Sequence, residues 1–136
     1  MAVKLIASDL DGTLLTNKKE LSPRTREALD LAAAQGIYLV PATGRSFESV
    51  PEMIREYPGV EYLITANGGA VYSVSEKKRI YQCLMTSESV EAAIAVRKRE
   101  KMVMEVVIDG VPYAEEDYVR DPLSYLATEY GARYIK

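Results

Sequence analysis

Runs of apolar residues along the first half of the chain predict three buried strands that alternate with two helices. Val3 to Leu10 is apolar at successive rather than alternating positions, the pattern of a parallel strand buried on both faces. Ser22 and Pro23 suit the N-cap and first position of a helix, and Gly36 suits its end. This order predicts a parallel sheet with right-handed crossovers and helices on its faces. The later strands are expected at residues 37–40 and 62–65, and the second helix at about residues 47–57.

After Thr65 the elements become shorter and turn signals more frequent. The turn Asn67-Gly68-Gly69 precedes a hairpin, and Asp109-Gly110 between two apolar runs is the strongest short hairpin signal in the chain. We place a domain boundary near Cys83, which divides the chain into residues 1–82 and 83–136. The expected elements are a hairpin over residues 70–72 and 79–81, a helix over 87–98, strands over 103–108 and 111–114, and a helix over 122–130.

The fold class is therefore α/β, a doubly wound (Rossmann-like) parallel sheet followed by a small α+β module. The 136 residues are 48% hydrophobic, enough for a packed core, and the net charge of −3 comes without a basic stripe. We expect no nucleic acid as a partner. No apolar run reaches about 18 residues, so we expect no membrane span. Cys83 is the only cysteine, which excludes a disulfide framework and a CxxC site and favours the cytoplasm.

Two carboxylates, Asp9 and Asp11, follow the first predicted strand at its carboxyl end, where open α/β sheets bind ligands. Close like charges resist joint ionisation unless they share a cation, which indicates a divalent metal. Magnesium prefers oxygen ligands and often bridges to phosphate. An Asp-Gly pair after a strand can also be a plain turn. A calcium loop is excluded, because Glu20 falls at its twelfth position but Leu14 occupies the sixth, which needs glycine.

Three segments in order carry a family resemblance. The stretch Val3 to Leu15, ending in Ser8-Asp9-Leu10-Asp11-Gly12-Thr13-Leu14-Leu15, resembles the first motif of the haloacid dehalogenase (HAD) superfamily of phosphatases. Ala42-Thr43-Gly44-Arg45 resembles the second motif as it occurs in the Cof-type sugar-phosphate phosphatases. Ile64 to Gly69 is similar to the segment after the third strand of that subfamily. The resemblance implies that residues 1–82 form the first half of a HAD core and that residues 83–136 begin an α/β cap.

The resemblance also implies a role for each matched residue. Asp9 is the expected nucleophile, which forms an aspartyl phosphate that water then hydrolyses. Asp11 is the expected acid and base, protonating the leaving alcohol and later activating the water. The Asp9 carboxylate and the Asp11 backbone carbonyl are expected to bind Mg²⁺. Thr43 is expected to donate its hydroxyl to a phosphoryl oxygen, helped by the Gly44 amide.

Three further residues have less certain roles. Arg45 either contacts the phosphate or holds Asp11, unless it is a plain surface arginine at a helix start. Asn67 either contacts the phosphate site or serves only as the first residue of an Asn-Gly turn. Thr13 is expected to support the loop rather than touch substrate.

Two parts of the family's constellation have no counterpart in these 136 residues. The third motif supplies a lysine and the fourth supplies metal-binding aspartates, usually beside a glycine, whereas no Gly-Asp dipeptide occurs here. Lys101 and Lys136 fall in the expected cap and have no claim to the lysine's role. We therefore expect an incomplete form, with weak Mg²⁺ binding and little phosphatase activity of its own. Because the family places its first strand between the second and the fourth, we expect that strand to lie at an edge here and to promote self-association.

The expected function is a Mg²⁺-dependent phosphohydrolase for small phosphate esters such as sugar phosphates. Dehalogenases of the superfamily lack the second acid that Asp11 provides, and ion pumps have threonine there and need membrane spans. A phosphomutase keeps both acids and stays open as an alternative. So does a non-catalytic fragment that binds partners or anions.

Overall fold

The computed structural model of the chain describes residues 2–100 and 102–121. It divides into two compact units, Met1–Cys83 and Leu84–Lys136, which are described separately below. In the part of the chain that is described, no helix is both long and apolar enough to cross a membrane. The helix expected at residues 122–130 lies outside the described residues.

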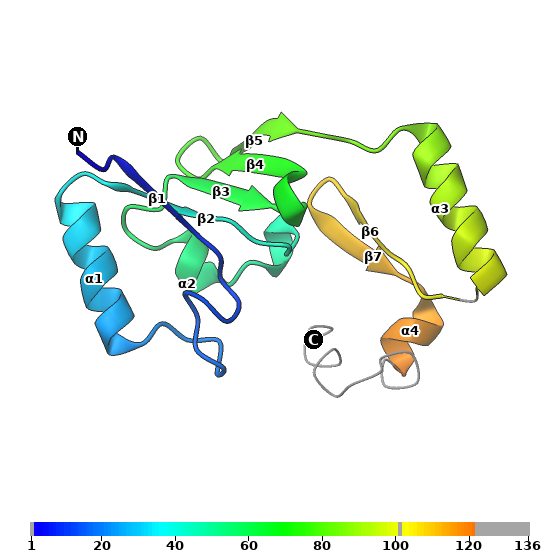
Figure 1. The fold of residues 1–136 in the computed structure, drawn as a ribbon, viewed down its shortest axis with the longest axis horizontal. Helices are drawn as coiled ribbons and strands as arrows, with labels where there is room; N and C mark the ends of the chain where they lie inside the picture. The colour runs from blue at the N-terminus through cyan, green and yellow to red at the C-terminus, as the bar shows by residue number, and fades with distance from the viewer. Residues whose placement is uncertain (1, 101, 122–136) are drawn as a thin grey trace. The chain divides into compact units, whose positions relative to one another are not determined.

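The first unit is built on a short parallel sheet that a hairpin extends (Figure 1). β1 (Leu5–Ser8) pairs in parallel with β2 (Tyr38–Pro41). Isolated parallel bridges from Leu39 to Val60 and from Ala42 to Ile64 join β2 and the residue after it to residues 60–64. β3 (Tyr62–Thr65) then pairs antiparallel with β4 (Ala70–Ser73), and β4 pairs antiparallel with β5 (Lys78–Gln82). The expected parallel strands and the hairpin after them are confirmed.

Local sequence signals determine where the helix between β1 and β2 begins and ends. In α1 (Pro23–Ala34), the Ser22 hydroxyl accepts the Thr25 amide at 3.0 Å, and proline occupies the first turn. Gly36 ends the segment with a φ of 71°, a left-handed conformation that costs glycine little. The expected N-cap, first turn and terminal glycine of this helix are therefore confirmed.

The single helix expected at residues 47–57 is wrong. The structure has a 3-10 turn, η1 (Phe47–Ser49), and a one-turn helix, α2 (Glu52–Arg55), with extended backbone at Val50 and Pro51 between them. Proline lacks the amide proton that a continuous helix would use and disfavours helical backbone at the residue before it. The apolar spacing of this segment still predicted which side chains face the core, because Val50 and Ile54 are both buried.

The core of the first unit lies between the sheet and its helices. Leu10 and Leu63 are completely buried, and Val50 and Ile54 are nearly so. Ten buried residues form one contiguous cluster, against which Phe47, Tyr72 and others pack. The cluster comprises Leu10, Leu15, Leu21, Ala32, Leu39, Val50, Ile54, Tyr57, Val60 and Leu63.

The expectation that the first strand is buried on both faces is wrong. Leu5 and Ile6 are 50% and 39% exposed, and Val3 before them is exposed as well. An apolar run indicates that a strand can be buried, but its burial also requires other elements that cover both of its faces. In the described part of the chain β2 is the one strand paired with β1, so the expected edge position is confirmed.

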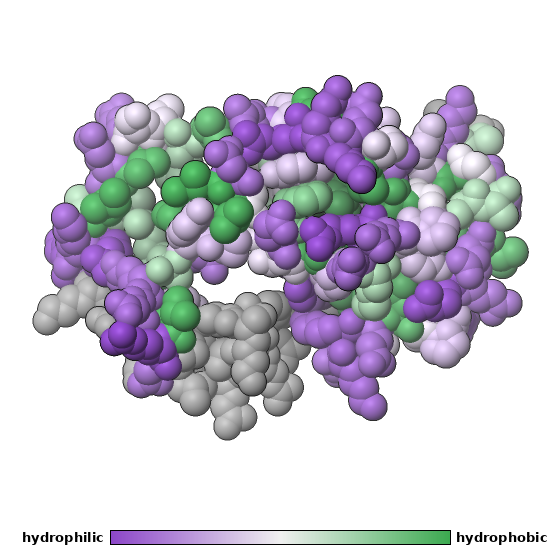
Figure 2. Space-filling model, turned by 180° about the vertical axis from the view of Figure 1, so that it is seen from behind, coloured by the Kyte–Doolittle hydropathy of each residue, from purple (hydrophilic) through white to green (hydrophobic). Residues whose placement is uncertain are grey.

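The second unit has a helix, a hairpin and a short final helix. α3 (Ser87–Glu100) is followed by β6 (Glu105–Ile108) and β7 (Val111–Ala114), which pair antiparallel, and then by α4 (Glu116–Arg120). Asp109 and Gly110 form the two-residue turn with φ values of 52° and 87°, which confirms the expected hairpin. Hydrophobic side chains of the hairpin, including Val107 and Ile108, are exposed. Figure 2 shows apolar areas interspersed with hydrophilic ones on the surface of the chain.

Candidate active site

The loop after β1 holds its two acids on either side of a buried leucine. Leu10 is 0% exposed, whereas Asp9 is exposed and Asp11 is half-buried. The Leu14 amide donates to the Asp9 carbonyl at 3.2 Å, and the Leu15 amide donates to the Leu10 carbonyl at 2.8 Å. These bonds close the loop on itself. The buried leucine and the closed loop therefore determine where both carboxylates lie.

Asp9 is open to solvent and to an incoming ligand. Its Oδ2 accepts a weak hydrogen bond from the Thr13 hydroxyl at 3.4 Å, so Thr13 supports the loop as expected. Gly12 between them has a φ of 82°, which allows the tight turn. Within the described residues no lysine or arginine pairs with the Asp9 carboxylate. A carboxylate with so few partners is free to act as a nucleophile or as a metal ligand.

Asp11 has the opposite surroundings, because two cations hold it. Arg45 donates from Nε to Oδ2 at 2.7 Å and from Nη2 to Oδ1 at 2.9 Å. Lys19 donates from Nζ to Oδ1 at 2.8 Å. The Arg45 hydrogen bond lowers the pKa of Asp11 to about 2, with partial burial opposing it and Lys19 adding to it. Asp11 is therefore ionised at neutral pH in this arrangement.

The ends of three strands bring the second motif beside the acids. The Ala42 amide donates to the Ser8 carbonyl, and the Thr43 amide donates to the Ile64 carbonyl, both at 2.9 Å. Thr43 is 6% exposed, and its hydroxyl oxygen accepts the Arg45 amide at 3.2 Å. Because the oxygen is the acceptor in that bond, the hydroxyl proton is still available for a ligand.

The segment after β3 reaches the same place through a strained turn. The Ala66 amide donates to the Arg45 carbonyl at 2.8 Å, and the Asn67 amide donates to the Thr43 carbonyl at 3.2 Å. Ala66 and Asn67 both have left-handed backbone, with φ values of 50° and 54°. A Cβ atom on Gly44 would lie 2.8 Å from the Asn67 Oδ1. Glycine therefore lets the Asn67 side chain lie directly against the second motif.

Five of the six expected site residues are thus linked by direct contacts: Asp11, Thr43, Gly44, Arg45 and Asn67. Asp9 joins them through the closed loop. Of the interpretations kept for Arg45, the structure shows the contact with Asp11. Lys19 was not anticipated, because nothing in its sequence context separates it from the solvated Lys18 beside it. Lys136 and Lys101 lie outside the described residues.

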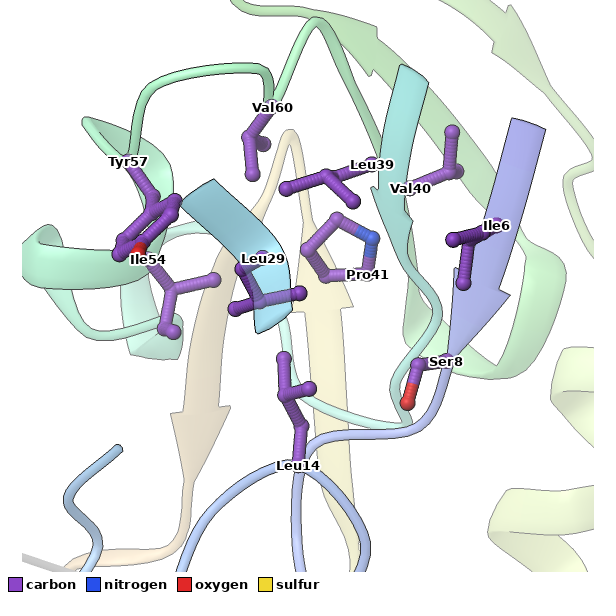
Figure 3. Close-up of a pocket in the computed structure, with 10 residues that line it drawn as sticks. All are labelled: Ile6, Ser8, Leu14, Leu29, Leu39, Val40, Pro41, Ile54, Tyr57 and Val60. Atoms are coloured by element: carbon purple, nitrogen blue, oxygen red, sulfur yellow. The ribbon is translucent and has the colours of Figure 1, made fainter. Parts of the chain in front are cut away.

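The first unit also has an apolar cavity, whose lining includes none of the six expected site residues (Figure 3). It has a volume of about 110 Å³, and side chains from α1, β1, β2 and the segment around α2 line it. Ser8 and Tyr57 supply the polar side-chain atoms, and no charged side chain lines it. Such a cavity does not suit an anionic ligand, so the acids at the end of β1 remain the candidate site.

Comparison with known proteins gives consistent matches. A family model of haloacid dehalogenase-like hydrolases matches residues 6–130. The chain is 39% identical over 70 residues to 5-amino-6-(5-phospho-D-ribitylamino)uracil phosphatase of Bacillus subtilis, covering 52% of this chain and 28% of that protein. It is 34% identical over 107 residues to the HMP-PP phosphatase of Klebsiella pneumoniae, covering 79% and 39% respectively.

A solved structure shows the same fold. The structure of a haloacid dehalogenase-like hydrolase from Bacillus subtilis superposes with a TM-score of 0.72 and 29% identity. The match covers 87% of this chain and 42% of that one. The chain thus spans between a quarter and a half of the length of the proteins it resembles.

Proposed function

The chain belongs to the haloacid dehalogenase-like hydrolases, and from that membership we propose that the protein is a phosphatase for small phosphate esters. The observation that carries the proposal is the contrast between exposed Asp9 and ion-paired Asp11, two carboxylates on one loop. Paired carboxylates in different surroundings are suited to different tasks. The ribityl phosphate in the name of one relative supports sugar phosphates or related esters as the substrate class.

Asp9 is the proposed nucleophile. One oxygen of its carboxylate forms a bond to phosphorus while the bond from phosphorus to the ester oxygen breaks, and the leaving alkoxide takes up a proton. Water then attacks the phosphorus of the aspartyl phosphate, which releases inorganic phosphate and restores the carboxylate. The exposure of Asp9 supports this assignment, because an incoming phosphorus can approach it.

Asp11 is the proposed acid and base. As the carboxylate of the free protein it can take a proton from the attacking water in the second step. Protonating the alcohol in the first step requires the neutral acid. A bound phosphate that draws Arg45 toward itself would raise the pKa of Asp11 toward its ordinary value. Phosphate binding would thereby prepare the acid for the first step.

Thr43, Gly44, Arg45 and Asn67 are the proposed phosphate contacts. The Thr43 hydroxyl retains a proton to donate, and Arg45 offers a planar guanidinium that matches phosphate oxygens. Asn67 lies against Gly44, so its side-chain amide and the Gly44 backbone amide can face the same ligand. Short contacts among these residues support one shared anion site.

Mg²⁺ fits the oxygen donors of the loop and is our proposed cofactor. The Asp9 carboxylate and the Asp11 backbone carbonyl would hold it. No cluster of three metal-binding side chains occurs among the described residues. Two protein ligands still suit Mg²⁺, which usually keeps several waters. When bound, the ion would supply positive charge that offsets the phosphate and the carboxylate.

We propose that Met1–Cys83 is the first half of the catalytic core and that Leu84–Lys136 begins the cap. A non-catalytic fragment that binds anions is the second candidate function. The specific observation in its favour is that no group of three or more metal-binding side chains occurs among the described residues. The free thiol of Cys83 supports the cytoplasm as the proposed location.

The exposed edge of β1 leads to one proposal about partners. We propose that the chain self-associates through this edge, because Val3, Leu5 and Ile6 are exposed beside backbone groups that no strand of the described residues pairs. Sedimentation of the chain and of Leu5→Lys tests it. The parent should sediment as a dimer or larger species and Leu5→Lys as a monomer. A monomeric parent at high concentration would exclude the edge as an interface.

Hydrolysis of p-nitrophenyl phosphate with Mg²⁺ tests the phosphatase proposal. We expect Asp9→Asn to lower turnover by roughly 10³-fold or more, as loss of a nucleophile does. Glu27→Gln, an isosteric change at an exposed position of α1, should leave turnover unchanged. If the unmodified chain is folded but gives no turnover, the second candidate is favoured. If Asp9→Asn keeps more than about 1% of the activity, Asp9 is not the nucleophile.

A further inference from the structure

Lys19 places a second cation on a carboxylate that an arginine already holds. Arg45 donates to both oxygens of Asp11, at 2.7 and 2.9 Å, and Lys19 adds a bond to Oδ1 at 2.8 Å. A carboxylate has about four lone-pair sites, of which these three donors occupy most. Rotation of the Asp11 side chain would break at least one charge-assisted bond. The contact therefore restricts the orientation of the carboxylate.

Lys19 lies in the loop between Asp11 and α1, and backbone hydrogen bonds close this loop. The Thr16 amide donates to the Glu20 carbonyl at 2.9 Å, and the Lys19 amide donates back to the Thr16 carbonyl at 2.8 Å. Lys19 has a φ of 62°, which is uncommon for a residue other than glycine. Such backbone persists where the surroundings hold it, often at functional sites.

Buried residues anchor both ends of this loop. Leu15 before it and Leu21 after it belong to the core of the first unit and are almost fully buried. The loop is thus a short, closed connection between two fixed points. Lys19 reaches Asp11 from a fixed position.

The neighbouring Lys18 shows what an ordinary lysine of this loop looks like. Its side chain is exposed and makes no ion pair with another described residue. Lys19 is less exposed, and its ammonium is 2.8 Å from a carboxylate oxygen. Fixing a lysine side chain costs up to about 2 kcal/mol of rotamer entropy, which the bond to Asp11 has to offset. The two lysines therefore form a natural test pair.

We propose that Lys19 is a positioning residue that, together with Arg45, holds the Asp11 carboxylate in one orientation for its work in the active site. The catalytic part of this inference rests on the function proposed above, whereas the orientation of Asp11 does not. Lys19 acts through Asp11 and touches no reacting atom. Its loss should lower the rate of the chemical step more than it weakens substrate binding.

The first experiment measures the orientation of Asp11 directly in the 136-residue chain. Couplings between the Hα and Hβ protons of Asp11, read by NMR, give the populations of its χ1 rotamers. In Lys19→Met the ratio of minor to major rotamer should rise about fivefold, equivalent to roughly 1 kcal/mol. Lys19→Arg and Lys18→Met should keep the parent ratio within about twofold. Equal rotamer ratios in Lys19→Met and Lys18→Met would overturn the proposal.

The second experiment measures turnover of p-nitrophenyl phosphate with Mg²⁺ in the same variants. Lys19→Met should lower kcat about fivefold with KM changed less than about twofold, and Lys19→Arg should restore kcat. A higher KM with unchanged kcat would mean that Lys19 binds substrate itself, which contradicts positioning. Absence of turnover in the parent would refute the proposed function, while the rotamer ratios would still decide the role of Lys19.

Discussion

The ion pair between Arg45 and Asp11 gives the sharpest test of the site's electrostatics. Replacing Arg45 by methionine keeps an unbranched side chain but removes both hydrogen bonds to Asp11 and a third, from Nη1 to the Ser49 carbonyl at 2.8 Å. Both side chains of the pair are about one-fifth exposed. Of its two cationic partners, Asp11 would keep Lys19. We expect a measurable loss of stability together with a higher pKa of Asp11.

The magnitude follows from the pKa of Asp11, which falls from 3.8 to about 2. That difference corresponds to roughly 2.5 kcal/mol in favour of the charged form at neutral pH. Arg45 is the largest cause, but Lys19 contributes, and the pair is partly open to solvent. Screening by water reduces the value of such pairs. We therefore expect Arg45→Met to lower the free energy of unfolding by roughly 1–2 kcal/mol at pH 7.

The pH dependence has a definite sign. A carboxyl group with a lowered pKa in the folded state stabilises the fold above its unfolded pKa and loses that effect as pH falls through the folded value. The difference between the parent and Arg45→Met should be complete above about pH 5 and mostly lost near pH 2. Urea unfolding across this range measures it, with Arg24→Met, an exposed arginine of α1, as the control. A difference that is independent of pH would refute the electrostatic explanation.

Two further predictions concern contacts around the site and the core. Tyr57→Phe should lower the free energy of unfolding by about 1 kcal/mol in urea titrations, because the hydroxyl of this buried residue donates to Asp30 at 2.6 Å. No loss would mean that water replaces this bond at no cost. Gly44→Ala should change stability by less than about 1 kcal/mol but shift the NMR signals of the Asn67 side-chain amide, since a Cβ would lie 2.8 Å from its Oδ1. Unshifted Asn67 signals would contradict the contact.

Elements with local signals were the ones that sequence predicted well. The cap at Ser22 and the glycine at position 36 placed α1 correctly, because both signals act within one turn of the helix. Asp109-Gly110 placed the second hairpin for the same reason, since each residue tolerates left-handed backbone. The family resemblance drawn from three short motifs is confirmed by the match over residues 6–130.

Features that depend on distant contacts were not predictable in the same way. The break at Pro51 is an exception, because proline is a local signal that the apolar spacing on either side of it concealed. Exposure of Leu5 could not be read from an apolar strand, because it depends on which elements cover that strand. The contact between Lys19 and Asp11 depends on left-handed backbone at a lysine, for which composition gives no signal.

The pairing of Asp11 also bears on how the site meets an anionic substrate. Asp9, Asp11, Arg45 and Lys19 carry two negative and two positive charges, so these four side chains balance one another. On the proposed function, attraction for a phosphate would then come from hydrogen-bond donors such as the Thr43 hydroxyl and from Arg45, which would exchange a bond to Asp11 for one to the phosphate. Loss of that bond would raise the pKa of Asp11. Substrate binding and protonation of the proposed acid would therefore be coupled through Arg45.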